Sequence, residues 1–129
     1  PEVLADFFVR DTVDAECRRS DHTAHTAPGT TKSLVNSLLS SPLDAGKHPR
    51  DLSSGQQMAL AIAIALASGC PELLIDEPTR GLDAFARANL AQLLREVAHD
   101  HAVAIATHDA DFVRELNAVT HTITEAVTA

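Results

Sequence analysis

A short apolar run that ends in two carboxylates constrains this chain more than any other feature of its sequence. Leu73-Leu74-Ile75 is followed directly by Asp76, Glu77 and the breaker Pro78. An apolar run of this length before a breaker predicts a buried strand of a parallel sheet over residues 72–76. Open α/β sheets carry their chemistry at the carboxyl edge, so the two acids are candidates for holding a hard cation and orienting a water. A solvated acidic turn is the alternative for an Asp-Glu pair taken alone.

Size and charge narrow the class of protein. The chain has 129 residues, enough for one modest domain, and a net charge of −8 with His neutral. It has no dense Lys/Arg cluster, so direct binding of nucleic acid is not expected. The longest apolar run, 58–67, is about half of what a membrane span requires, and no charged-then-apolar leader follows Pro1. These features, with the widely spaced Cys17 and Cys70, predict a soluble chain in a reducing cytosol, with two ordinary thiols that are buried or semi-buried.

The second part of the chain alternates between helical and strand patterns. The expected elements are a helix over 58–67, a strand over 72–76, a helix from an N-cap at Asp83 to about His99, a strand over 101–107, a helix over 109–116 and a final strand near 119–123. This order predicts a parallel α/β sheet. Residues 59–67 alternate in the period of a strand, but their alanines favour a helix, and the lack of a polar face predicts burial on all sides.

The first part of the chain is more polar and more broken. Short helices are expected over residues 12–19 and 31–39, joined by a polar connection over 20–29. The second of these helices has one apolar face, made by Leu34, Val35, Leu38 and Leu39. Pro42, Gly46 and Pro49 predict an irregular loop after it.

Two further segments suggest chemistry when they are taken together with the acidic pair. Leu52–Gln57 precedes the apolar helix, where free backbone N–H groups and small residues can bind an anion, although Ser-Ser-Gly alone is also a common helix cap. His108 follows the strand expected over 101–107. A lone His is usually structural, but a His at the same sheet edge as two acids is a candidate sensor or electrophile.

In this order, the segments resemble the motifs of the ATP-binding-cassette (ABC) ATPase family. Leu52–Gln57 resembles the signature motif LSGGQ, with Ser54 where the family usually has Gly. Residues 73–77 resemble the Walker B strand, Gly81-Leu82-Asp83 the D-loop, and His108 the switch histidine. The start of the chain, from Phe7 to Val13, is similar to the segment that follows the Q-loop. Residues 11–17, 27–32 and 48–53 resemble the second nucleotide-binding half of actinobacterial energy-coupling-factor (ECF) ATPases, which drive vitamin or metal-ion uptake.

This resemblance implies a fold and a division of the chain. The fold is α/β, part of the parallel sheet of a P-loop NTPase with flanking helices. A small α-helical subdomain would cover residues 1–51, and the carboxyl-terminal part of the ATPase core would cover 52–129. The resemblance also implies ATP and Mg²⁺ as cofactors.

The resemblance implies a role for each motif residue that this chain shares with the family. Asp76 would hold Mg²⁺ through water, Glu77 would act as the base that positions the hydrolytic water, and His108 would contact the γ-phosphate. Asp83 would connect two active sites across a dimer. The signature residues would cap the γ-phosphate of a nucleotide on the opposing subunit, and these are Ser53, Ser54, Gly55 and Gln56.

The implied function is that of an ATP-hydrolysing subunit, or a fragment of one, that powers uptake through an ECF-type membrane transporter. Its partners would be a second ABC ATPase subunit and a transmembrane permease, at the inner face of the cell membrane. Two alternatives remain open at this stage. One is a soluble ABC ATPase that acts on ribosomes or DNA, and the other is a non-catalytic remnant that donates only a signature motif.

The chain departs from the family in its phosphate-binding loop. The family needs G-x-x-x-x-G-K-[ST], but the only Lys-Ser here is Lys32-Ser33, and Thr26 and Thr31 occupy the glycine positions. A helix that starts after Pro28-Gly29 is the better interpretation. The glutamine of the Q-loop is absent as well. We therefore expect negligible ATP affinity and no hydrolysis by these 129 residues alone, and a sheet edge and part of the core left uncovered.

Overall fold

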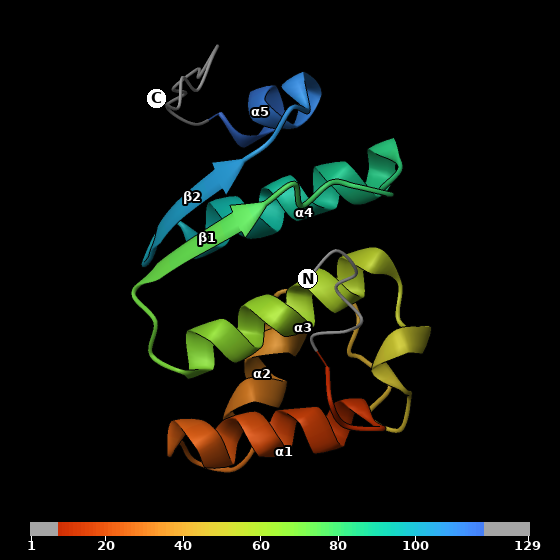
Figure 1. Cartoon of the computed structure of the whole chain (residues 1–129), viewed down its shortest axis with the longest axis vertical. Coiled ribbons are helices and arrows are strands. Elements are labelled where there is room, and N and C mark those ends of the chain that lie inside the picture. Colours follow the sequence, from red (N-terminus) through yellow and green to blue (C-terminus); the bar gives the residue numbers. More distant parts are fainter. Residues whose placement is uncertain (1–7, 118–129) are drawn as a thin grey trace, which may run out of the picture.

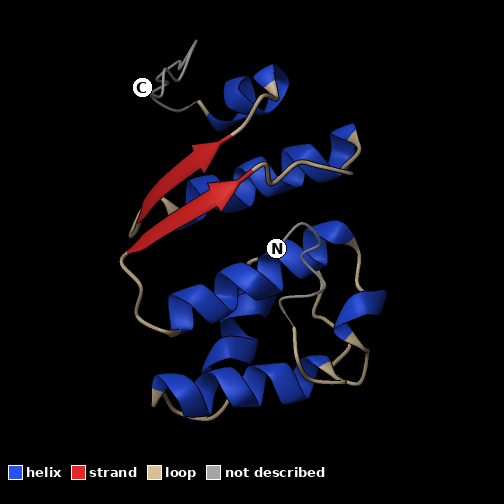
Figure 2. Ribbon diagram, in the orientation of Figure 1, coloured by secondary structure: helices blue, strands red, loops and turns tan. Residues whose placement is uncertain are grey.

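The structure, a computed structural model, describes residues 8–117, and its helical and sheet-containing parts follow one another along the chain (Figure 1). The elements are α1 (Val13–Ala24), α2 (Thr30–Ser37), the 3₁₀ turn η2 (Pro49–Asp51), α3 (Ser54–Ala67), β1 (Glu72–Asp76), α4 (Ala84–Val97), β2 (Ala102–Ala106) and α5 (Ala110–Leu116). In the ribbon view, α1, α2 and α3 gather at one end, and the two strands with α4 and α5 lie at the other (Figure 2). The strand expected near 119–123 lies outside the described residues.

The first helix is longer than its sequence pattern predicts. Thr12 caps α1 by accepting a hydrogen bond from the Ala15 N–H at 3.0 Å, and the helix continues to Ala24. The prediction of a polar connection over 20–29 is therefore wrong for residues 20–24, which belong to the helix. The reason is a tertiary contact. Asp21, near the end of this helix, is buried, and its carboxylate accepts hydrogen bonds from the backbone N–H groups of Gly29 and Thr31.

The helix α2 begins at Thr30, directly after Gly29, and so confirms the helix start expected after Pro28-Gly29. Gly29 has a φ of +91°, a left-handed conformation that favours glycine, which lets the chain turn sharply into the helix. Of the apolar face expected here, Val35 is completely buried, and Leu34, Leu38 and Leu39 are partly buried against the core. The helix ends at Ser37, two residues earlier than expected, with Leu38 as its C-cap.

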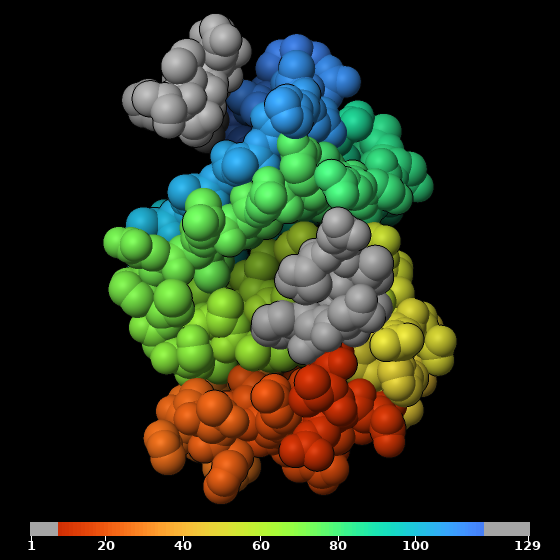
Figure 3. Space-filling view, viewed as in Figure 1, coloured from red at the N-terminus to blue at the C-terminus, as the bar shows by residue number. Residues whose placement is uncertain are grey.

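The alanine-rich segment is a helix, as its composition predicts, and not a strand. It begins at Ser54 with a capping box in which Ser53 and Gln56 each bond the other's backbone N–H. The expectation of burial on all sides is wrong: Leu60 and Ile62 are buried, whereas Ile64 and Leu66 are only half-buried. In the space-filling view, α3 (yellow-green) lies on the side of the helical end that is next to the sheet end (Figure 3).

The two strands pair in parallel, as expected for strands joined through a helix. The register pairs Leu73 with Val103 and Ile75 with Ile105. The strand predicted to be buried is buried on one face only, because Leu73 is 7% exposed whereas Leu74 is 83% exposed. Successive side chains of a strand point to opposite faces, so Leu73 reaches the core and Leu74 faces the side that the described elements leave open.

The helix α4 packs one apolar stripe against the core, at the positions that its helical spacing predicts. The stripe residues are all buried, and they are Leu90, Leu93, Leu94 and Val97. The helix α5 packs against α4 through Phe112, which has no exposed surface. Within residues 8–117, no helix has the length and apolar character that a membrane crossing requires.

Both cysteines have free thiols, as their spacing predicts. Cys17 is buried on α1, as expected. The burial expected for Cys70 is wrong, because this residue is exposed in the connection between α3 and β1. Burial, with a smaller contribution from the nearby Asp21, raises the pKa of the Cys17 thiol to about 11. A thiol with so high a pKa is protonated near neutral pH and is a poor nucleophile, so Cys17 belongs to the core.

Candidate functional site

The carboxyl edge of the two-stranded sheet brings together three residues that lie far apart in sequence. Asp76 is the last residue of β1 and pairs in register with Ala106, the last residue of β2. Glu77 then donates its backbone N–H to the carbonyl oxygen of Ala106 at 2.7 Å. His108 follows β2 by two residues, so Asp76, Glu77 and His108 lie on one rim of adjacent parallel strands.

Glu77 adopts an unusual backbone conformation at this rim. Its φ of +47° is in the left-handed region, which costs a residue with a Cβ about 1 kcal/mol or more. The carboxylate is held on both oxygens: Oε1 accepts the His108 N–H at 2.9 Å, and Oε2 accepts the Thr107 hydroxyl at 3.3 Å. The end of β2 therefore fixes the direction of the Glu77 carboxylate.

The imidazole of His108 is completely exposed and remains close to the same carboxylate. Its Nε2 lies 3.8 Å from Oε1 of Glu77. A fully exposed ring beside an oriented carboxylate can donate a hydrogen bond to an incoming anion without first leaving a buried partner. This arrangement offers a general base and a donor on one surface, which suits hydrolysis of a charged ester or anhydride.

Asp76 contributes one exposed carboxylate beside this pair. Across the part of the chain that the structure describes, no group of three or more His, Cys, Asp or Glu residues could hold a metal ion. A site made only of protein ligands is therefore not present among these residues. Mg²⁺ suits a single carboxylate here, because it keeps several waters and takes its remaining ligands from substrate phosphates.

Two further residues with a close contact, Asp109 and Arg87, lie near the end of β2 and on α4. Asp109 caps α5 by accepting the Phe112 N–H at 3.0 Å, and its carboxylate lies 3.5 Å from a guanidinium nitrogen of Arg87 on α4. The Phe112 N–H, followed by the Thr79 hydroxyl and Arg87, holds the pKa of Asp109 below its ordinary value. The helix-capping pattern could have identified Asp109, but no local signal in the sequence identifies Arg87.

The candidate signature residues form the start of α3. Ser53 Oγ accepts the Gln56 N–H at 3.2 Å, and Gln56 Oε1 accepts the Ser53 N–H at 3.0 Å. The side chains of Ser53 and Gln56 are thus both occupied by hydrogen bonds to backbone N–H groups at the helix start. Ser54 is exposed at the first helical position, and Gly55 follows it. A Cβ added to Gly55 would meet no atom within 4 Å, so no other part of the described chain covers this position at the start of the helix.

The candidate D-loop faces the same groove as the candidate signature motif. Asp83 caps α4 by accepting the Ala86 N–H at 2.8 Å, and Gly81 before it has a φ of +79°. Residues 53–56 and 81–83 both line a groove of about 1,090 Å³ that also runs along α2 and α4. Neither Glu77 nor His108 lines this groove, so the rim and the groove are two separate candidate surfaces.

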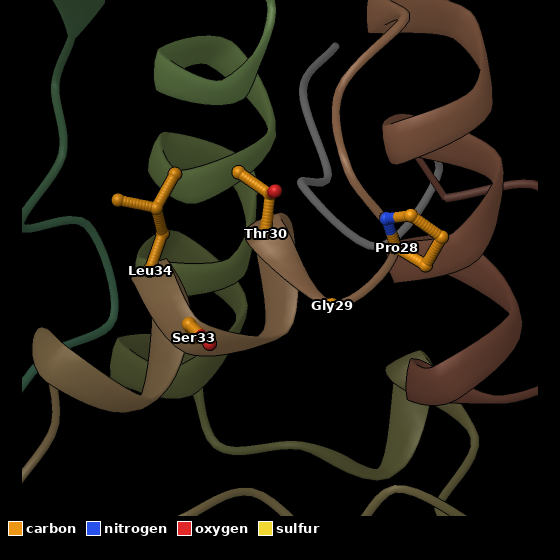
Figure 4. Close-up of a pocket in the computed structure, with 5 residues that line it drawn as sticks. All are labelled: Pro28, Gly29, Thr30, Ser33 and Leu34. Atoms are coloured by element: carbon orange, nitrogen blue, oxygen red, sulfur yellow. The ribbon is translucent and has the colours of Figure 1, made fainter.

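A smaller pocket of about 490 Å³ lies at the start of α2 and is lined by Pro28, Gly29, Thr30, Ser33 and Leu34 (Figure 4). Of the only Lys-Ser pair in the sequence, Ser33 lines this pocket. Lys32 does not line this pocket, and its Nζ lies 3.9 Å from Oδ1 of Asp14 on α1. The Lys32 ammonium therefore pairs with a surface carboxylate, which is the behaviour of an exposed helical lysine.

A known family and several known proteins match this chain. Residues 26–114 match the family described as "AAA domain, putative AbiEii toxin, Type IV TA system". A protein of Streptomyces avermitilis named "Putative ABC transporter ATP-binding protein" is 50% identical over 117 residues, which are 90% of this chain and 21% of that protein. A protein of the same name from Clostridium tetani is 34% identical over 108 residues, 83% of this chain and 25% of that protein.

A solved structure shares the fold. It is described as "An inward-facing conformation of a putative metal-chelate type ABC transporter", and its chain superposes with a TM-score of 0.67 and 27% identity. The match covers 83% of this chain and 47% of the solved chain. The chain spans about a fifth of the length of the first two curated relatives that it matches.

Proposed function

Because this chain belongs to the AAA domain family and is homologous to the ATP-binding proteins of ABC transporters, we propose that it forms part of the ATP-hydrolysing subunit of an ECF-type transporter that drives substrate uptake. The observation that carries this proposal is the contact between Glu77 and His108 at the rim that also bears Asp76. The α/β fold, a parallel two-stranded sheet with flanking helices, matches that of a solved ABC transporter.

Each rim residue has a role that suits its position. The Glu77 carboxylate, oriented by the His108 N–H and the Thr107 hydroxyl, positions and deprotonates the attacking water. The exposed imidazole of His108 donates a hydrogen bond to the terminal phosphate. Asp76 would hold Mg²⁺, and that ion would neutralise negative charge on the phosphates of ATP during transfer of the phosphoryl group.

The groove provides a second surface, which we propose acts on a nucleotide held by another ATPase subunit. The signature residues at the start of α3 would cap that nucleotide's γ-phosphate, and Asp83 on the same groove would connect the two active sites. The partners in this proposal are a second ABC ATPase subunit and a transmembrane permease, at the inner face of the membrane. We propose a helical subdomain over 1–51 and a part of the ATPase core over 52–129.

We further propose that the 129 residues alone bind ATP negligibly and do not hydrolyse it. Their sequence contains no G-x-x-x-x-G-K-[ST] loop, and Lys32, the nearest candidate, pairs with Asp14 instead. Without that cradle of N–H groups, the charge of a triphosphate is not neutralised on this chain. Saturable Mg²⁺-dependent turnover by purified 1–129 would contradict this part of the proposal.

The catalytic role of the rim is tested by a chimera. The segment of the Streptomyces avermitilis protein that matches this chain is replaced by residues 1–129, and ATP hydrolysis is measured. We expect turnover in the chimera and a loss of about 100-fold on Glu77→Gln, because the amide cannot act as a base. Glu72→Gln is the matched control, since Glu72 is an exposed carboxylate at the opposite end of the same strand. Equal turnover in both variants, or none in the parent chimera, contradicts the proposal.

The accessible start of α3 favours a second candidate function, in which the chain donates only its signature surface to a complete ABC partner. This function predicts that 1–129 raises the ATPase rate of such a partner and that Glu77→Gln leaves the rate unchanged. Co-purification with permease subunits supports the transporter role, whereas co-purification with ribosomes supports a soluble ABC ATPase.

A further inference from the structure

We propose that Arg87 is a positioning residue that ties the start of α4 to the carboxylate of Glu77 through Asp109. The geometry stands by itself, and its importance for hydrolysis rests on the function proposed for Glu77 and His108. Three links carry the inference: the first two join separate elements, and the third lies within the first turn of α4.

The first link joins α4 to the loop after β2. A terminal guanidinium nitrogen of Arg87 lies 3.5 Å from Oδ2 of Asp109, and both side chains are only 22% exposed. The Arg87 Nε is buried, makes no hydrogen bond within residues 8–117 and lies 3.9 Å from Oε1 of Glu115. Two carboxylates thus face one partly buried guanidinium, which is screened from water more than a surface ion pair would be.

The second link joins Asp109 to Glu77. The Asp109 N–H donates to the Thr107 hydroxyl at 3.0 Å, and this hydroxyl donates to Oε2 of Glu77 at 3.3 Å. A hydroxyl that accepts one hydrogen bond and donates another makes the two bonds depend on each other. The position of Asp109 therefore affects the carboxylate of Glu77 and, through its other oxygen, the His108 N–H.

The third link joins Arg87 to the turn that precedes α4. The Arg87 N–H donates to the carbonyl oxygen of Asp83 at 2.9 Å, so Arg87 lies in the first turn of the helix that Asp83 caps. Asp83 lines the groove, and Glu77 lies on the rim. The contacts from Asp83 through Arg87, Asp109 and Thr107 to Glu77 therefore form one connected set of hydrogen bonds and one ion pair.

A second arginine on α4, Arg95, provides a control, because it contacts α5 without contacting Asp109. Arg95 donates to the carbonyl oxygen of Glu115 at 2.8 Å and thus also joins α4 to α5. No hydrogen bond or ion pair of Arg95 reaches Asp109 among the described residues. Arg95→Ala is therefore a matched control for Arg87→Ala, with the same helix, residue type and neighbouring helix.

The test is amide hydrogen exchange, followed by NMR at pH 7 on the 129-residue chain without nucleotide. We expect Arg87→Ala to lower the protection of the His108 N–H about fivefold, because losing a partly buried ion pair makes local opening easier. Arg87→Lys should recover most of the protection, and Arg95→Ala should leave it unchanged. The Leu94 N–H, in the last turn of α4, should exchange alike in all variants and so reports on global stability.

A second variant tests the link through Asp109 without removing a helix cap. Asn is as good an N-cap as Asp, so Asp109→Asn keeps the bond to the Phe112 N–H while removing the charge that faces Arg87. We expect Asp109→Asn alone to lower the protection of the His108 N–H by no more than Arg87→Ala does. The double variant should show the same protection as Arg87→Ala alone, because both substitutions break the same ion pair.

Three results would overturn the proposal: an unprotected His108 N–H in the parent chain, equal effects of Arg87→Ala and Arg95→Ala, or additive effects in the double variant. The assay contains no ATP, so it is independent of the proposed function. Loss of turnover in the Glu77→Gln chimera with unchanged exchange in Arg87→Ala would keep the function and reject this inference.

Discussion

The backbone N–H of His108 lies 2.9 Å from Oε1 of Glu77, although 31 residues separate the two in sequence. The contact arises because β1 and β2 are parallel and end in register, with Asp76 opposite Ala106. The residues that follow the two strands therefore lie at the same carboxyl edge of the sheet. This contact orients the one carboxylate in the proposed site whose chemistry requires a defined direction.

The left-handed backbone of Glu77 predicts an unusual order of stability among its variants. Glu77→Ala and Glu77→Gly both lose the bonds from Thr107 and His108, but only glycine adopts a φ of +47° without strain. We expect the glycine variant to be more stable than the alanine variant by about 1 kcal/mol in urea unfolding. At exposed Gln92 within α4 the order should reverse, because glycine weakens a helix. An alanine variant at position 77 that is as stable as the glycine variant would exclude strain there.

The capping box at the start of α3 predicts that the two adjacent serines differ. Ser53→Ala removes the oxygen that accepts the Gln56 N–H and should cost about 1 kcal/mol of unfolding free energy. Ser54→Ala should change it by less than about 0.5 kcal/mol, because Ser54 is exposed and alanine is a good helix former. Thermal or urea unfolding measures both, and equal costs would show that the capping box does not form in solution.

The buried Asp21 predicts a loss of stability in acid. Burial by itself would raise the pKa of this carboxyl, but the hydrogen bonds from Thr31, Gly29 and Thr26 outweigh it and lower the pKa from 3.8. A carboxyl whose pKa is lowered on folding stabilises the protein above its unfolded pKa and loses this contribution as the pH falls through the folded pKa.

Asp21→Asn should therefore be less stable than the parent chain by about 2 kcal/mol at pH 7, since hydrogen bonds to a charged group are lost. The difference should shrink as the pH is lowered from 5 to 3, which urea unfolding at each pH measures. Asp44→Asn, at an exposed turn, is the control and should change stability by less than about 0.5 kcal/mol. A difference that is constant with pH would contradict the role of the Asp21 charge.

A buried and an exposed phenylalanine should differ strongly in how much their truncation lowers the free energy of unfolding. Phe112→Ala should destabilise the chain by about 3 kcal/mol or more, because a completely buried aromatic ring leaves a cavity between α5 and α4. Phe85→Ala should be nearly neutral, since Phe85 is 77% exposed. The midpoints of thermal unfolding compare the two variants, and a small loss at Phe112 would mean that α5 does not pack as described.

Much of the fold follows from local patterns. The bounds of β1 agree with those predicted, and α4 keeps its N-cap at Asp83 and its apolar stripe. The helix at Ser54–Ala67 follows from the helical preference of alanine, although its pattern alternates as in a strand. Each of these features depends on residues within one or two turns of each other, which is why a single stretch of sequence is sufficient to predict it.

The errors have tertiary causes. The continuation of α1 to Ala24 depends on Thr31 and Gly29, which bind the Asp21 carboxylate from outside the helix. The exposure of Leu74 depends on which elements cover the sheet, and an apolar residue in a strand pattern does not state how many faces are covered. Arg87 at the rim was missed because its partner, Asp109, lies on another helix.

The sequence by itself determined which chemistry is available: two acids and a histidine after strands, and small residues at the start of a helix. These are properties of residue type and short-range order. Only the tertiary structure decided that Oε1 of Glu77 accepts the His108 N–H, and that the guanidinium of Arg87 lies 3.5 Å from the carboxylate of Asp109. The physical reason is that strand register and helix packing are set by the burial of the whole core, and no local segment specifies them.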